Sequence, residues 1–398
     1  MVKKADIGRE KVLLTGVTGL VGAAFVVALV KNRRNVDFVC VARGRSGKTA
    51  QARVEEALRA ECEFEGCENL CDEVLSAVSV VDGDVSRLDT RELAGCRQIK
   101  NIDKIFHCAA DVNLGKDPTG RVFRANYEGT LQMVELAKRI GAREFHLVST
   151  AYVVGDTKGK VMESAVSADR AFNNPYEDSK CKAEMLVRES GIPFTIYRPG
   201  IIVGRKSDGR IRKALAFYRI LEFLQKLKGR TAARSGVSPS DWMDMDMNCG
   251  SKASPNIYFV PIDYVSDAIS TLFFFPANGE TYHLTGGTPV TANQILEATC
   301  SVFRLDGVSI GLEREYTTEN ERVFSKYVGD LFPYFASDIV FDQSNINRDW
   351  PEGMNRRYGY EDLERMVRAY LLDNFHSVEW VRQMVSKPAE RRPMLHRR

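Results

Sequence analysis

Short apolar runs alternate with longer helical patterns through the first half of the chain. The apolar runs are four to seven residues long and predict strands at 11–15, 36–42, 78–81, 104–108, 144–148 and 194–197. Between them, helical spacing or composition predicts helices at 20–31, 49–60, 126–140 and 177–189. Strands separated by helices of ten or more residues are typical of a parallel sheet covered on both faces. The pattern therefore predicts a doubly wound α/β domain over residues 1–205.

The pattern changes after Gly204. A helix is expected at 211–228, and residues 232–255, which are polar and lack periodicity, are expected to form a long surface loop. Strands are predicted near 257–262 and 281–284, returning to the main sheet, and helices at 292–303 and 360–370. We therefore predict a smaller, mainly helical substrate-binding domain over residues 206–398, with strands near 257–286 joining the first domain. The last dozen residues, with four arginines, are expected to be a frayed basic tail.

Composition agrees with an ordinary globular protein. The chain has 398 residues, of which 44% are hydrophobic and 27% charged, enough for two domains or one large one. Fifty-six basic residues nearly cancel fifty-three acidic ones, and this balance argues against a nucleic-acid partner. Nine cysteines, an odd number at low density, predict reduced thiols and a cytoplasmic location.

The apolar stretch 12–30 follows Lys3 and Lys4 and therefore has some features of a signal peptide or membrane span. Threonines and glycines interrupt it near residues 15–22, and no convincing small-residue cleavage site follows. We expect a buried strand, a glycine turn and a buried helix, and no transmembrane segment.

Gly16, Gly19 and Gly22 follow the first strand directly and open the first helix. In such a turn one glycine permits the tight bend, one admits a pyrophosphate, and one lets helix pack on strand. The helix N-terminus adds free N–H groups and a positive dipole. A plain glycine turn is the alternative, but this context predicts a Rossmann-like dinucleotide site. Its expected cofactor contacts are Thr15, Gly16, Thr18, Gly19, Leu20, Val21 and Gly22.

The end of the second strand distinguishes the two nicotinamide cofactors. An acidic residue there binds the ribose 2′-hydroxyl of NAD, whereas an arginine accommodates the 2′-phosphate of NADP. Arg43 occupies that position, 21 residues after Gly22, with Arg45 or Arg53 in support. We predict NADPH, bound through Arg43 and Arg53 by charge-assisted contacts. A solvated surface arginine is the alternative.

Tyr176 and Lys180 are four residues apart and share one face of a predicted helix. A tyrosine has an ordinary pKa near 10, and a nearby ammonium is expected to draw that pKa toward neutrality. Ser149 and Thr150 follow the fifth strand and offer a hydroxyl to hold a substrate oxygen. Taken alone, the tyrosine and lysine would be read as a surface pair.

Further motifs in order along the chain resemble an extended short-chain dehydrogenase/reductase. They are Gly16-x-x-Gly19-x-x-Gly22, Asp84, His107-Cys-Ala-Ala110, Asn126, Ser149-Thr150, Tyr176-x-x-x-Lys180 and Tyr197-Arg-Pro-Gly200. The match covers about residues 10–205, and segments 260–265 and 283–285 extend it.

The resemblance implies roles for individual residues. Thr150, Tyr176 and Lys180 would be the catalytic set, with Tyr176 and Lys180 also touching the cofactor. Asp84 and Val85 would lie at the adenine, and Ala109 and Ala110 at the nicotinamide ribose. The remaining implied cofactor residues are Asn126, Pro199, Gly200 and Ile202.

The helical insertion after the second strand, residues 49–59, is similar to that of thioester reductases. Thioester reductases are the terminal reductase domains of peptide synthetases and carboxylic acid reductases, and fatty acyl-CoA reductases share the insertion. Segments 148–152 and 197–204 also resemble those of the thioester reductases. The resemblance implies hydride transfer from NADPH to an acyl thioester on CoA or a carrier protein. The product would be an aldehyde, or an alcohol after a second hydride.

Other functions remain open at this stage. A sugar-nucleotide epimerase or dehydratase shares the fold, but Arg43 argues against it because those enzymes usually carry an acid there. A ketone or aldehyde reductase is another alternative, and the intact catalytic set argues against a non-catalytic binding protein. Cys62, Cys67 and Cys71 lack the paired spacing of a zinc site, so we expect no metal. The acyl chain, the oligomeric state, the role of loop 232–255 and any partner of helix 211–228 stay open.

Overall fold

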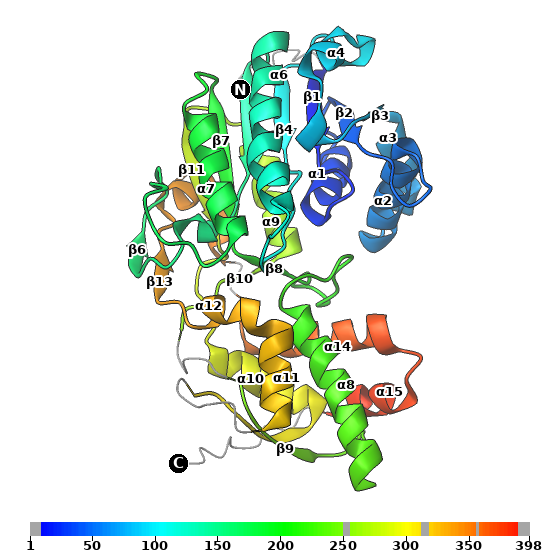
Figure 1. The fold of residues 1–398 in the computed structure, drawn as a ribbon. Coiled ribbons are helices and arrows are strands. Elements are labelled where there is room, and N and C mark those ends of the chain that lie inside the picture. Colours follow the sequence, from blue (N-terminus) through cyan, green and yellow to red (C-terminus); the bar gives the residue numbers. More distant parts are fainter. Residues whose placement is uncertain (1–8, 250–254, 312–317, 356–357, 389–398) are drawn as a thin grey trace.

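Seven parallel strands form the central sheet of the computed structural model, which describes residues 9–249, 255–311, 318–355 and 358–388 (Figure 1). The sheet order is β11-β7-β5-β4-β1-β2-β3, so the chain winds outward in both directions from the gap between β1 and β4. This confirms the predicted doubly wound sheet. The strands are β1 (Glu10–Thr15), β2 (Val36–Ala42), β3 (Val78–Asp82), β4 (Lys104–His107), β5 (Glu144–Val148), β7 (Phe194–Pro199) and β11 (Glu280–Leu284).

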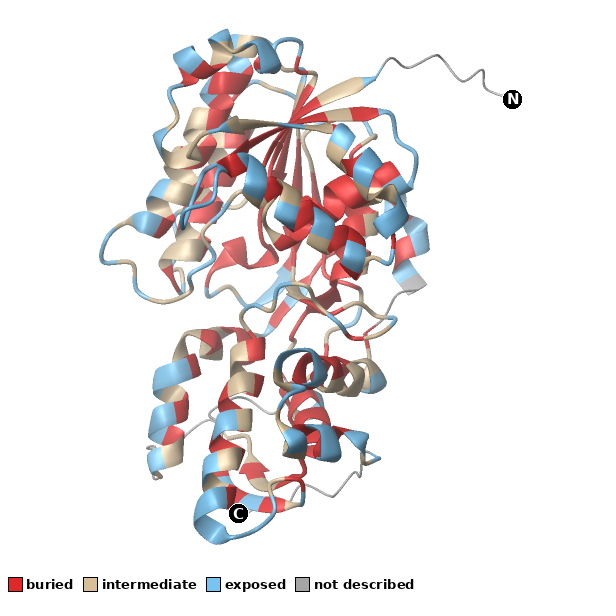
Figure 2. Ribbon diagram, turned by 90° about the vertical axis from the view of Figure 1, so that its right-hand side faces the viewer, coloured by how far each residue is buried: buried red, intermediate tan, exposed pale blue. Residues whose placement is uncertain are grey.

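Helices cover both faces of the sheet because alternate strand residues point to opposite sides. In β1, Val12 and Leu14 belong to one buried cluster and Leu13 to another. The first cluster includes residues of α1 (Leu20–Lys31), α2 (Ala50–Phe64), α3 (Cys71–Ser76) and α9 (Ile262–Leu272). The second includes residues of α4 (Thr90–Gly95), α6 (Gly129–Ile140) and α7 (Pro175–Arg188). Figure 2 shows the inner strands of the sheet buried between these layers, whereas the edge strand β3 has no buried residue.

The N-terminal apolar stretch is β1, a glycine turn and α1, as predicted. The helix has twelve residues, and ten of them are buried against the sheet and its neighbours. Among the described residues, no helix is both long enough and apolar enough to cross a membrane.

A second lobe, mainly helical, lies below the sheet in Figure 1. Its helices are α8 (Tyr218–Ser235), α10 (Ala292–Phe303), α11 (Glu319–Val328), α12 (Phe332–Phe335), α14 (Tyr360–Phe375) and α15 (Glu379–Ser386). Three parallel two-stranded pairs complete the fold: β6 (Gly159–Val161) with β13 (Ile339–Phe341), β8 (Ile201–Val203) with β10 (Phe259–Pro261), and β9 (Met243–Asn248) with β12 (Leu305–Ser309). Helix α13 (Ser344–Asp349) contacts β11.

The sequence prediction was wrong at several positions in the second half. The expected loop 232–255 begins with the last turn of α8 and contains β9, and α8 starts at Tyr218 rather than at residue 211. Of the two strands expected to return to the main sheet, β11 joins it, whereas β10 pairs with β8 outside it. Most of the expected basic tail, from residue 389 onward, lies outside the described residues.

Candidate active site

Two adjoining cavities lie at the carboxyl ends of the sheet strands, where the strand order reverses. The outer cavity has a volume of about 540 Å³ and the inner cavity about 490 Å³. They share five lining residues, which are Gly19, Cys108, Ala110, Val112 and Lys213. In doubly wound sheets, ligands bind at this switch point, so the two cavities together form the candidate site.

Most of the predicted site residues line these cavities. The outer cavity is lined by Gly16, Thr18, Gly19, Arg43, Arg53, Asp84, Val85, Ala109 and Ala110. The inner cavity is lined by Gly19, Leu20, Val21, Ala110, Thr150, Tyr176, Lys180, Pro199, Gly200 and Ile202. Three predicted residues line neither cavity: Thr15, Gly22 and Asn126.

The glycine turn at the start of α1 needs two of its glycines for packing. Gly16 has φ +81°, and a Cβ on it would stand 2.6 Å from the Ala109 amide nitrogen. A Cβ on Gly22 would stand 2.4 Å from the Gly16 carbonyl oxygen. Gly19 lines both cavities. Gly22 is therefore needed for the close packing of α1 on the turn, and Gly19 leaves room for a ligand such as a pyrophosphate.

Thr15 is fully buried and holds the end of β4 in place. Its hydroxyl accepts a hydrogen bond from the Ala109 amide at 3.2 Å and lies 2.7 Å from His107 Nδ1. His107 Nε2 lies 3.1 Å from the Thr130 hydroxyl, which itself donates to the Asn126 carbonyl. The network is satisfied when Thr15 donates to Nδ1 and Nε2 carries the ring proton. Burial lowers the pKa of His107 to about 3, which keeps the ring neutral.

Asn126 connects the loop after β4 to the helix that carries Tyr176. It lies in a π-helical turn (Arg124–Glu128) and is buried. Its amide nitrogen donates to the Asp111 carbonyl at 3.0 Å and to the Ser179 hydroxyl at 2.9 Å, and its oxygen accepts from the Asp111 amide at 2.7 Å. Ser179 in turn donates to the Tyr176 carbonyl at 2.8 Å. Asn126 is therefore placed as a positioning residue rather than as a cofactor contact.

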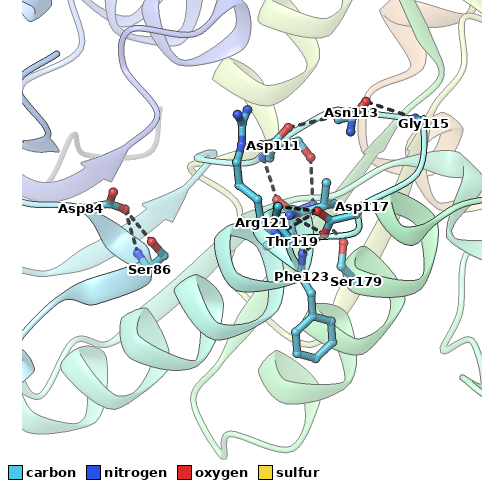
Figure 3. Close-up of polar contacts among 12 residues, drawn as sticks. Asp84, Ser86, Asp111, Asn113, Gly115, Asp117, Thr119, Arg121, Phe123 and Ser179 are labelled. Carbon is cyan, nitrogen blue, oxygen red and sulfur yellow. Dashed lines mark hydrogen bonds and ion pairs between the residues drawn. The ribbon is translucent and has the colours of Figure 1, made fainter. Parts of the chain in front are cut away.

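The loop between β4 and the π-helical turn is ordered by Asp117 (Figure 3). Its carboxylate accepts from the backbone amides of Arg121 at 2.9 Å and Val122 at 2.8 Å, and so caps the short helix α5 (Arg121–Phe123). Arg121 Nε donates to Asp111 at 2.5 Å, while the rest of this exposed side chain lines the outer cavity. The loop thus places an ion pair, Arg121 with Asp111, at the wall of the outer cavity.

Three arginines line the outer cavity beyond β2: Arg43, Arg45 and Arg53. Arg43 pairs with Asp84 at 2.5 Å and remains half exposed, and Arg53 donates to the Arg43 carbonyl. Burial opposes ionisation of Asp84, but hydrogen bonds from Arg43 and Ser86 hold its pKa below the usual value. The carboxylate thereby orients Arg43 at the cavity wall.

Helix α7 begins at a strong capping position. Asn174 accepts from the Glu177 amide at 3.0 Å, and Pro175 occupies the first helical position. The Asn174 amide nitrogen donates to the Tyr334 hydroxyl at 2.8 Å, and this contact ties the helix to the second lobe. The helix start therefore fixes where Tyr176 stands.

Tyr176 and Lys180 meet in the inner cavity, but not in the predicted electrostatic relation. Burial raises the pKa of Tyr176, and a hydrogen bond with Thr150 opposes that rise only partly. Lys180 Nζ donates instead to the Val148 carbonyl at 2.7 Å. The expectation that Lys180 draws the tyrosine pKa toward neutrality is therefore wrong for this geometry. Burial also lowers the pKa of Lys180, to about 8.

Cys108 belongs to the motif His107-Cys-Ala-Ala110, from which the sequence predicts no role for it. It lines both cavities, and Lys180 lines the inner one. Burial raises the pKa of the Cys108 thiol to about 12, so the thiol stays protonated near neutral pH. Its place between the cavities makes it a wall residue rather than a nucleophile.

The far wall of the inner cavity is apolar and comes from the second lobe. Sequence analysis missed these residues because they carry no chemical motif and reach the cavity only through tertiary packing. The main ones are Leu215, Phe217, Leu331, Tyr334 and Phe335.

Comparison with known proteins agrees with this geometry. A family model described as "Male sterility protein", an NAD-binding domain, matches residues 14–269. The chain belongs to this family. It is an oxidoreductase of the extended short-chain dehydrogenase/reductase type, and the resemblance to terminal reductase domains is confirmed. The family match and the NAD-bound structural neighbours support a nicotinamide cofactor.

The similar proteins are mostly much longer. A carboxylic acid reductase from Segniliparus rugosus is 26% identical over 334 residues, which cover 77% of this chain and 27% of that protein. The chain thus spans about a quarter of the length of such curated relatives.

Solved structures share the fold. The terminal R domain of the myxalamid PKS-NRPS pathway superposes with a TM-score of 0.70 at 22% identity, covering 93% of this chain and 92% of that one. A UDP-glucuronic acid 4-epimerase from Bacillus cereus with NAD gives a TM-score of 0.61 at 17% identity, covering 93% and 99%.

Proposed function

We propose that this protein is an NADPH-dependent reductase of acyl thioesters carried by CoA or by a carrier protein. The observation that carries the proposal is the apolar lining that residues such as Leu215, Phe217 and Phe335 contribute to the cavity that also holds Tyr176. A sugar would need polar partners for its hydroxyl groups there, whereas an acyl chain needs none. The carboxylic acid reductases and peptide synthetases among the relatives support the same reading.

The outer cavity suits the phosphorylated end of NADPH. Arg43, Arg45 and Arg53 offer positive charge for a 2′-phosphate, and the Gly19 turn opens α1 toward a pyrophosphate. Lys180 and Ala110 lie in the inner cavity, where the nicotinamide half would reach. Bound NADPH would supply the hydride.

The residues of the inner cavity would carry the proton transfer. Tyr176 would donate its phenolic proton to the thioester oxygen as negative charge develops, and Thr150 would orient that oxygen. Because burial raises the pKa of Tyr176, the phenol is protonated at neutral pH, the state that reduction requires. The resulting thiohemiacetal would collapse to an aldehyde and a free thiol. A second reduction would give an alcohol.

One assay tests this function. The protein is mixed with NADPH and an acyl-CoA or acyl-carrier thioester, and both the loss of reduced nicotinamide and the release of thiol are followed. We expect both signals, in equal amounts for a reaction that stops at the aldehyde. NADPH oxidation without thiol release would instead indicate a ketone or aldehyde substrate. No oxidation, together with tightly bound NAD, would indicate an epimerase or dehydratase.

Replacing Arg43 by Ala should weaken NADPH binding roughly tenfold, because one charge-assisted contact to the 2′-phosphate is lost. NADH binding should stay the same or improve, since Asp84 is released from its ion pair. Titration of both cofactors measures this difference. Lys48→Ala is the matched control, because Lys48 is exposed, pairs with Glu56 and lies outside both cavities. An unchanged preference for NADPH would remove Arg43 from the phosphate site.

The charge of Lys180 should set a pH limit on the free enzyme. Its pKa is about 8, so the ammonium is present below that pH and is lost above it. We expect kcat/KM for NADPH to be level below pH 8 and to fall about tenfold per pH unit above it. Lys182→Ala, on the exposed side of the same helix, should keep this profile. A profile that stays flat up to pH 10 would contradict the assignment.

A further inference from the structure

Lys213 stands where the two cavities join. It is exposed, it lines both cavities, and no carboxylate of the described residues pairs with it. Partial burial lowers the pKa of its ammonium, and the positive charges of Arg212, Arg53 and Arg45 lower it further. A cation kept among cations at a cavity wall is expected to be stabilised by an anionic ligand.

Arg212, which precedes Lys213, binds the glycine turn and so fixes the backbone position of Lys213. Arg212 Nη2 donates to the Gly19 carbonyl at 2.7 Å, and Arg212 Nε pairs with the carboxylate of Glu61 in α2. Glu61 is fully buried, so this ion pair is shielded from solvent on the carboxylate side. Lys213 is therefore held beside the N-terminus of α1 by contacts made within the protein.

We call residues 205–217 the linker segment, because they connect the end of β8 to α8. Its first residue is also fixed on α2: Arg205 donates to the Phe64 carbonyl at 2.5 Å, and its guanidinium lies 4.0 Å from the Phe64 ring centroid. Both anchors, at 205 and 212, thus use the helical insertion that follows β2. This gives the insertion a structural role in the site.

The other end of the linker segment forms part of the inner cavity. Leu215, Ala216 and Phe217 line it, and the Phe217 ring packs 4.9 Å from that of Phe259. Ala216 has φ +43°, which is uncommon for a residue with a Cβ. Such a conformation persists only where the surroundings impose it, so the packing of this segment holds a defined shape at the cavity wall.

We propose that Lys213 binds the diphosphate of the nicotinamide cofactor, and that the linker segment thereby couples cofactor binding to the shape of the acyl cavity. The second half rests on the proposed function, which places the acyl group in the inner cavity. The diphosphate links the two halves of the cofactor, which would occupy the two cavities. Lys213 lines both cavities and therefore lies where the diphosphate would pass. A lysine suits this role because its mobile ammonium can follow either phosphate.

Ligand binding tests the first half. Lys213→Met should weaken NADPH and NADH about tenfold each, because both contain the diphosphate. Adenosine 2′-monophosphate lacks the diphosphate and should bind the variant and the wild type equally, while Lys213→Arg should restore most of the NADPH affinity. Equal affinities of the variant and the wild type for all three ligands would overturn the proposal. A loss confined to NADPH and adenosine 2′-monophosphate would also overturn it, by assigning Lys213 to the 2′-phosphate. These measurements involve no turnover, so their outcome is independent of whether thioesters are reduced.

A second measurement tests the coupling. An unreactive thioether analogue of acyl-CoA should bind the wild type about fivefold more tightly when NADP⁺ is present, and this gain should vanish in Lys213→Met. Lys226→Met is the matched control, because Lys226 is exposed on α8, pairs with Glu222 and lines neither cavity. It should keep the gain. A gain that persists in Lys213→Met would overturn the coupling. Failure of the analogue to bind at all, alongside the expected cofactor results, would count against the thioester function and leave the diphosphate contact standing.

Discussion

Replacing Tyr176 by Phe is expected to lower kcat about 10³-fold and to leave the affinity for NADPH nearly unchanged. In the proposed mechanism the phenol gives a proton to the developing oxyanion, and general acids of this kind contribute between about 10² and 10⁴. The ring itself stays, so the wall of the inner cavity keeps its shape. Single-turnover kinetics with NADPH and an acyl thioester, together with a cofactor titration, measure both quantities.

The matched control is Tyr127→Phe, because Tyr127 lies in the π-helical turn and lines neither cavity. It should keep full activity. The wild type should also show no tyrosine titration between about pH 6 and 9, since burial holds the pKa of Tyr176 above its ordinary value near 10. Unchanged turnover in Tyr176→Phe would remove the phenol from the mechanism.

Replacing Arg198 by Met should destabilise the fold by about 3–5 kcal/mol, measured by urea unfolding. Arg198 on β7 is fully buried and makes two hydrogen bonds to Glu184 of α7, at 2.9 and 2.6 Å, and one to the Ser164 carbonyl at 2.9 Å. The variant leaves the buried Glu184 carboxylate without its main cation, and only the more distant Arg188, at 3.8 Å, remains. Loss of one partner of a buried ion pair is among the costliest single changes in a protein.

The pH dependence separates this mechanism from a packing defect. Burial alone would raise the pKa of Glu184, but Arg198 holds this pKa below its usual value. The ion pair therefore stabilises the protein above the ordinary glutamate pKa of about 4.3, and this stabilisation is lost as the pH falls. In Arg198→Met the carboxyl takes up a proton instead, so the deficit should narrow from pH 7 to pH 5. The double variant with Glu184→Met should recover much of the loss at pH 7. A deficit of equal size at both pH values would indicate lost packing.

The sheet domain was predictable because its signals are local. The residues of α1 are apolar on nearly every side and follow a glycine turn, so the sequence predicted its bounds, Leu20–Lys31, as the structure has them. The strand β9 was missed for the opposite reason. Its buried methionines alternate with exposed aspartates, residues of low strand propensity, and its partner β12 lies some 60 residues further along the chain.

In the candidate site, too, residues in local motifs could be predicted, whereas residues that depend on tertiary contacts could not. Residues tied to motifs, such as Gly19 and Tyr176, line the cavities. Thr15 and Asn126 belong to the same motifs but act one layer behind the surface, a distinction that only burial and hydrogen bonds reveal. Lys213 has no motif, and its position depends on contacts of the linker segment with α1 and α2 that the sequence pattern does not record.

The hydrogen bond between Asn174 and Tyr334 limits how this enzyme can be re-engineered. A chimaera that took its helical lobe from a relative would exchange much of the apolar lining of the inner cavity, and it would also replace the hydroxyl that holds the Asn174 side chain at the start of α7. Tyr176, the proposed proton donor, stands two residues further along that helix. Under the proposed function, a graft of the helical lobe would therefore change both the cavity lining and the support of Tyr176 unless it kept a tyrosine at position 334.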